Sequence, residues 1–131
     1  MLLIFVKYPE PGKVKTRLAK EIGARNAALL YRRMAEGIIN DLSKLIDYRK
    51  IIFFDPPERK NDFMRWLNFN GFSYIEQEGD SLGERMSNAF RHAFSLGVDK
   101  AVVIGTDCPQ ISTQTILKAF EKLETSDVVI G

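Results

Sequence analysis

The chain has 131 residues, 45% of them apolar and 27% charged, which indicates an ordinary globular protein with one domain over residues 1–131. The net charge of +2 is too small to indicate general nucleic-acid binding, and no run approaches the roughly 20 apolar residues of a membrane span. The single cysteine excludes an internal disulfide, and together with the lack of a signal peptide it predicts a cytoplasmic protein.

Short apolar runs alternate with helical patterns along the chain. The apolar runs predict five strands, at residues 2–6, 51–54, 72–77, 101–105 and 127–131. Three- and four-residue apolar spacing predicts helices at residues 16–21, 24–46 and 58–69, from the Asp80 or Ser81 cap to residue 96, and from the Ser112 cap to residue 124. This order predicts an α/β fold in which a mostly parallel sheet lies between two layers of helices, a three-layer α/β/α architecture. Because the chain ends within the last run, one interpretation is that it is a shortened form of a longer domain.

A stiff basic loop follows the first predicted strand. Four cations occur in this loop, at Lys7, Lys13, Lys15 and Arg17. Two prolines restrict the backbone, and Gly12 supplies the freedom that a sharp bend needs. A solvated basic loop is the alternative. Its place at the end of a buried strand and before a helix favours phosphate binding, with Lys7, Gly12 and Lys13 as binding residues and Lys15 and Arg17 as catalytic ones.

Asp107 directly follows the predicted strand at residues 101–105, and Pro109 restricts the chain that leaves it. A hard carboxylate at a rigid turn suits Mg²⁺ or Mn²⁺. The alternatives are a cap or a salt bridge. The basic loop across the sheet favours the metal. Residues 1–65 carry a net charge of +6 and residues 66–131 a net charge of −4, a split that suits a phosphate ligand with a divalent metal and that chance could also produce.

A glycine-containing segment precedes and opens the helix that reaches residue 96. It contains Gly79, Asp80, Leu82 and Gly83, followed by Arg85. Backbone N–H groups at such a helix start can hold a nucleobase, a ribose or a phosphate. The alternative is simple capping of the helix.

Three blocks resemble the signature of a glycosyltransferase-A-like family within the nucleotide-diphospho-sugar transferases. The first is K-x-P-x-P-G-x-V-K-T-R-L at residues 7–18, the second covers residues 77–86, and the third is I-G-T-D-C-P at residues 104–109. Some members of this family are arsenosugar-biosynthesis glycosyltransferases, and the wider superfamily includes guanylyltransferases of molybdenum-cofactor and coenzyme F420 synthesis. Members continue into a D-G-G-Y-Y-like block, which this sequence lacks.

The resemblance implies a Rossmann-like glycosyltransferase-A fold that binds a nucleotide with Mg²⁺ or Mn²⁺. Lys7, Lys15 and Arg17 would contact phosphates, the loop at residues 79–83 would lie near the nucleoside, and Asp107 would hold the metal. The implied activity is glycosyl or nucleotidyl transfer with a diphosphate leaving group, from a nucleoside triphosphate or nucleotide sugar to an acceptor that the motifs do not identify. The alternative is a nucleotide-binding or assembly module without turnover.

Overall fold

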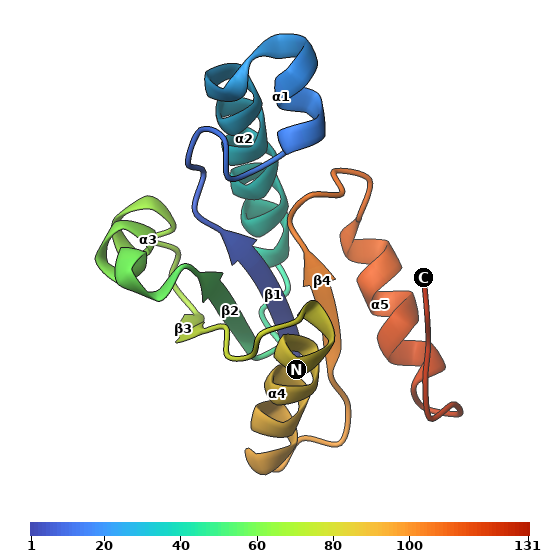
Figure 1. The fold of residues 1–131 in the computed structure, drawn as a ribbon. Coiled ribbons are helices and arrows are strands. Elements are labelled where there is room, and N and C mark those ends of the chain that lie inside the picture. The colour runs from blue at the N-terminus through green and yellow to red at the C-terminus, as the bar shows by residue number, and fades with distance from the viewer.

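A four-stranded parallel sheet in the order β3-β2-β1-β4 forms the centre of the computed structural model, which describes residues 1–131 (Figure 1). Its strands are β1 (Leu2–Lys7), β2 (Lys50–Asp55), β3 (Phe72–Glu76) and β4 (Val102–Gly105). In this register Leu2 of β1 lies opposite Lys50 of β2 and Val102 of β4. Because all strands run the same way, their carboxyl ends and the loops that follow them meet at one edge.

Helices cover both faces of the sheet. They are α1 (Thr16–Ile22), α2 (Ala24–Ser43), the 3-10 turn η1 (Pro57–Arg59), α3 (Lys60–Trp66), α4 (Leu82–Ser95) and α5 (Thr113–Lys122). Alternate residues of a strand point to opposite faces. Ile4 therefore packs in one core cluster with α2, α3 and α5, whereas Leu3 packs in another with Ala89 and Ala93 of α4. Figure 1 shows α4 in front of the sheet and α2 behind it. The predicted three-layer α/β/α architecture is confirmed.

Two local devices position the loops at the carboxyl edge. Gly23 separates α1 from α2 with a φ of 82°, a conformation that glycine adopts without a steric penalty. At the start of α4, the Ser81 hydroxyl accepts from the Glu84 amide, and the Glu84 carboxylate accepts from the Ser81 amide, which forms a capping box. None of the helices has the length and apolar character needed to cross a membrane.

Two predicted helices are shorter than the apolar pattern indicated. α2 ends at Ser43 rather than at residue 46, and Ile46 is 84% exposed, so continuing the helix would bury nothing there. The helix predicted at residues 58–69 begins with η1 and ends at Trp66. The Tyr74 hydroxyl donates to the Leu67 carbonyl at this end and satisfies a helix-terminal acceptor.

The fifth strand predicted at residues 127–131 is wrong. Val128 is 72% exposed and Ile130 is 91% exposed, and the segment pairs with no strand, so β4 remains an edge of the sheet. An apolar run is only a local signal, whereas a strand also needs a neighbouring strand whose backbone N–H and C=O groups pair with its own.

Candidate functional site

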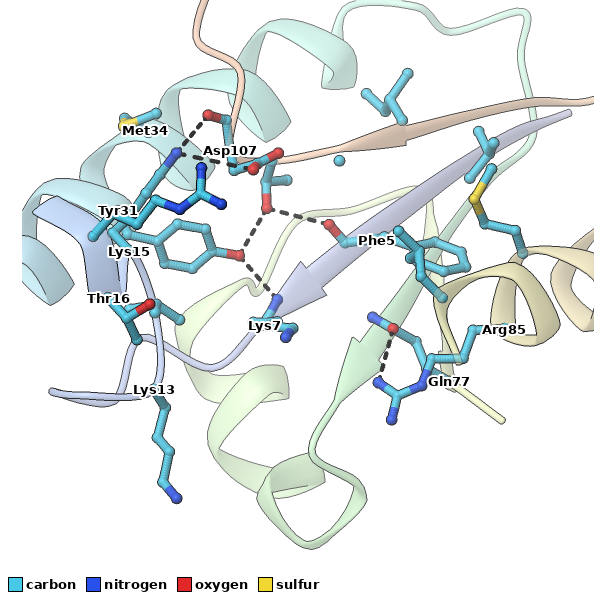
Figure 2. A pocket seen from close by; sticks show the side chains of 18 of the residues that line it. Phe5, Lys7, Lys13, Lys15, Thr16, Tyr31, Met34, Gln77, Arg85 and Asp107 are labelled. Carbon is cyan, nitrogen blue, oxygen red and sulfur yellow. Dashed lines mark hydrogen bonds and ion pairs between the residues drawn. The ribbon is translucent and has the colours of Figure 1, made fainter. Parts of the chain in front are cut away.

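A cavity of about 1190 Å³ opens at the carboxyl edge of the sheet. Its walls come from the end of β1, the basic loop, α1, α2, the start of α4, and β4 with the loop that follows it. Ligand pockets usually measure about 300–1,000 Å³, so this cavity is large enough to hold a small-molecule ligand. Figure 2 shows Lys15 and Asp107 on one side of the cavity and Arg85 and Gln77 on the other.

The basic loop is anchored by one apolar side chain. Val14 is buried in a small cluster with Ala28 and Tyr31 of α2, which holds the loop against the helix. Lys15 follows at the N-cap of α1 with a φ of 47°, an uncommon conformation for a residue with a Cβ. The four cations of the loop all line the cavity, namely Lys7, Lys13, Lys15 and Arg17.

Lys15 and Asp107 meet on one side of the cavity although they lie 92 residues apart in the sequence. The Lys15 ammonium donates to the Asp107 backbone carbonyl over 2.8 Å, and it lies 3.9 Å from the Asp107 carboxylate. The side chain of Lys15 is 26% exposed and that of Asp107 is 71% exposed. The structure thus brings the cationic loop and the acid into direct contact at the edge where ligands of parallel sheets bind.

Tyr31 and Thr106 form a buried hydrogen-bond chain beneath these two residues. The Lys7 amide donates to the Tyr31 hydroxyl over 2.9 Å, and the Thr106 hydroxyl donates to the Phe5 carbonyl over 3.2 Å. The Tyr31 hydroxyl must therefore donate across the 2.9 Å that separate it from the Thr106 oxygen. Burial raises the pKa of Tyr31 above its ordinary value, although its hydrogen bonds oppose the shift, so the hydroxyl keeps its proton at neutral pH.

Local patterns in the sequence do not indicate these hydrogen bonds. Tyr31 falls on the apolar stripe of the helix predicted at residues 24–46, a position typical of a core residue. The position of Thr106 after a strand favours a hydrogen bond to local backbone, with orientation of a ligand as the alternative, but its partners Phe5 and Tyr31 lie 101 and 75 residues away. Its position between an apolar strand and Asp107 was the one available signal.

Gln77 and Arg85 occupy the opposite side of the cavity. The buried Gln77 amide donates to the carbonyls of Phe53 and Val6, which ties the end of β3 to β2 and β1. The Arg85 guanidinium donates to the Gly79 carbonyl over 2.8 Å and lies 3.2 Å from the Asp55 carboxylate. Arg85 and Lys15 each have an acidic partner within the protein, whereas Lys7, Lys13 and Arg17 are exposed and form no ion pair.

The remaining predicted binding residues divide into two groups. Asp80 and Leu82 line the cavity, whereas Gly12, Gly79 and Gly83 do not. Gly79 is held against the start of α4, where an added Cβ would lie 2.8 Å from the Glu84 Cβ. Its φ of +130° also excludes most side chains, so packing alone requires glycine there.

Asp107 places a carboxylate at the Lys15 side of the cavity. The structure contains no group of three His, Cys, Asp or Glu side chains that could hold a metal. A single carboxylate still fits Mg²⁺ or Mn²⁺, because such cations commonly take one or two carboxylates and complete their shell with phosphate oxygens and water. The donor set therefore suits a cation that is held jointly with a phosphate ligand.

These features define a class of fold. The carboxyl edge of the parallel sheet carries a cationic loop and an acid around a large cavity, as in proteins that bind nucleotides. The structure matches the crystal structure of a "putative nucleotide-diphospho-sugar transferase" from Desulfovibrio desulfuricans G20 with a TM-score of 0.87 and 36% sequence identity. The match covers 95% of this chain and 54% of the other, so the chain spans about half the length of that protein. The predicted glycosyltransferase-A-like fold is confirmed, and the similarity supports the broad class of nucleotide-diphospho-sugar transferases.

The chain belongs to the family described as "uncharacterized protein conserved in bacteria" (DUF2064), which matches residues 38–131. No curated protein matches it.

Proposed function

We propose that this chain binds a nucleotide or nucleotide sugar by its diphosphate and belongs to a metal-dependent transferase that performs glycosyl or nucleotidyl transfer. One observation carries the proposal: the basic loop and Asp107 meet at one edge of the sheet, with the Lys15 ammonium 2.8 Å from the Asp107 carbonyl. The match to the Desulfovibrio protein, whose name specifies transfer from a nucleotide-diphospho-sugar, supports it.

The proposed chemistry depends on neutralising a departing diphosphate. In nucleotidyl transfer, an acceptor oxygen attacks the α-phosphorus and pyrophosphate leaves. In glycosyl transfer, the acceptor attacks the anomeric carbon and the nucleoside diphosphate leaves. Negative charge grows on phosphate oxygens in both reactions, and Lys15 and Arg17 line the cavity where that charge would lie. Loss of one such contact raises a barrier by roughly 2.7–4 kcal/mol where the donor is preorganised.

Asp107 is the residue that would hold Mg²⁺ or Mn²⁺ in this proposal. The cation would supply further positive charge at the phosphates. Lys7 would bind the same phosphates from the end of β1, where its amide is held by Tyr31. We assign no side chain as general base.

The resemblance of the motifs includes both reaction types, since it extends to arsenosugar glycosyltransferases and to guanylyltransferases. Both reactions require the protein to bind a diphosphate, and they differ in the atom that the acceptor attacks. Incubation with a panel of nucleoside triphosphates and nucleotide sugars, followed by detection of pyrophosphate or nucleoside diphosphate, distinguishes them.

Isothermal titration calorimetry with ADP, CDP, GDP and UDP, each with and without Mn²⁺, tests the proposal. We expect at least one of these nucleotides to bind only with Mn²⁺, and Lys15→Ala and Asp107→Asn to weaken that binding at least about tenfold. Lys20→Ala is the matched control, because Lys20 is an exposed lysine of α1 outside the cavity. Metal-independent binding that both site variants leave unchanged would refute the proposal.

A further inference from the structure

A cation of the protein itself lies beside Asp107. The Lys15 ammonium donates to the Asp107 backbone carbonyl over 2.8 Å and lies 3.9 Å from its carboxylate. A divalent cation that binds Asp107 must therefore displace this ammonium or remain close to it. The contact that brings the site together is also an obstacle to metal binding.

Lys15 can leave this contact without a movement of the loop. Val14, the preceding residue, is buried against α2 and fixes the backbone. The lysine stem itself is flexible, and the two partners are 26% and 71% exposed, so solvent reaches the contact. The Lys15 ammonium makes no other hydrogen bond with the protein. Rotation of one side chain is enough to free both the ammonium and the carboxylate.

Charge balance makes this contact selective for a pair of ligands. A metal ion alone would meet the positive ammonium, and a diphosphate alone would meet the negative carboxylate, so each ligand is opposed by a like charge. When both ligands arrive, the metal can take the carboxylate and the ammonium can take a phosphate oxygen. Each charge of the protein then has an opposite partner.

We infer that Lys15 is an exchangeable counter-ion of Asp107, which moves to the phosphates when a metal and a diphosphate bind together. This inference rests on the proposed function and adds that metal and nucleotide binding are coupled through Lys15. By linkage, each ligand raises the affinity for the other by the same factor. Lys15 consequently weakens the binding of metal alone and strengthens the binding of nucleotide.

The test measures these two opposite effects in one variant, Lys15→Met. Binding of Mn²⁺ alone is followed by electron paramagnetic resonance, which detects the free aqueous ion. We expect Lys15→Met to bind Mn²⁺ roughly two- to fivefold more tightly than wild type, the range that loss of an exposed ion pair provides. With Mn²⁺ present, calorimetry should show the tightest of ADP, CDP, GDP and UDP binding at least about tenfold more weakly to the same variant.

Lys13→Met is the control for a general change of charge at the cavity. Lys13 lines the same cavity but makes no hydrogen bond or ion pair with Asp107, and Figure 2 shows its side chain extending away from that residue. Its effect on Mn²⁺ affinity should be clearly smaller than that of Lys15→Met. Adding Asp107→Asn to Lys15→Met should abolish the gain. Lys15→Gln provides a second variant, and circular dichroism verifies that each one folds.

Two results would overturn the inference. One is a Mn²⁺ affinity of Lys15→Met and Lys15→Gln no higher than that of wild type or Lys13→Met. The other is a gain that persists when Asp107 is replaced by Asn. Failure of wild type to bind any of the four nucleotides with Mn²⁺ is a different result, which would refute the proposed function itself.

Discussion

The hydrogen bonds beneath the site make a quantitative prediction for Thr106→Val. Thr106 is 2% exposed and Tyr31 is 4% exposed, so both hydroxyls depend on partners within the protein. Valine keeps the shape of threonine but leaves the Tyr31 hydroxyl without its acceptor and the Phe5 carbonyl without this donor. Because an unsatisfied buried polar group costs about 1–3 kcal/mol, we expect Thr106→Val to lower the free energy of unfolding by about that amount.

Tyr31→Phe removes the other hydroxyl and leaves the Lys7 amide unpaired, at a similar expected cost. Each single substitution already removes the hydrogen bond between the Tyr31 and Thr106 hydroxyls, so the double variant does not lose it a second time. The double variant should therefore lose about 0.5–1.5 kcal/mol less than the sum of the two single variants.

Urea unfolding of wild type, both single variants and the double variant measures this coupling. Thr106→Ser retains the hydroxyl and serves as the control for the Tyr31 bond. Costs that add within about 0.3–0.5 kcal/mol would show that the two hydroxyls are not coupled and that their hydrogen bond does not stabilise the fold. A Thr106→Ser variant as unstable as Thr106→Val would instead indicate that the methyl group carries the effect.

Two further predictions concern the loop before α4 and the stability of α2. Gly79→Ala should destabilise the protein by about 1–3 kcal/mol in urea unfolding, because the φ of Gly79 is +130° and an added Cβ lies 2.8 Å from the Glu84 Cβ. Gly37→Ala in α2 should instead stabilise the protein by about 0.4–1 kcal/mol, because an added Cβ there meets nothing within 4 Å. Equal effects of the two alanines would contradict this. For Glu36, burial raises the pKa, but hydrogen bonds from Arg32 and Trp66 and nearby arginine charges outweigh it and leave the pKa below its ordinary value. The ionised carboxylate therefore stabilises the fold above pH 4.5 and loses that effect as the pH falls through its folded pKa, so the stability difference between wild type and Glu36→Gln should shrink as the pH falls below 4.5. A difference that stays constant over this range would refute the assignment.

Local patterns in the sequence determined the layers of this protein. Continuous apolar runs such as residues 2–6 indicate strands buried on both faces, and three- to four-residue spacing indicates the helices between them. Parallel strands place the loops after β1 and β4 at one edge, so the sequence pattern already predicts Lys15 and Asp107 at the same edge, and the pairing of β1 with β4 brings them into contact. The basic loop and the acid could be predicted because each follows a strand directly.

Only the tertiary structure decided which polar groups meet and where elements end. Tyr31 resembles a core residue in sequence, and it becomes part of the site because Thr106, 75 residues away, lies opposite its hydroxyl. Residues 127–131 have the composition of a strand but form none, since no neighbouring backbone pairs with them. Periodicity depends on the nearest few residues along the chain, whereas hydrogen-bond partners and strand neighbours depend on segments that folding brings together from far apart.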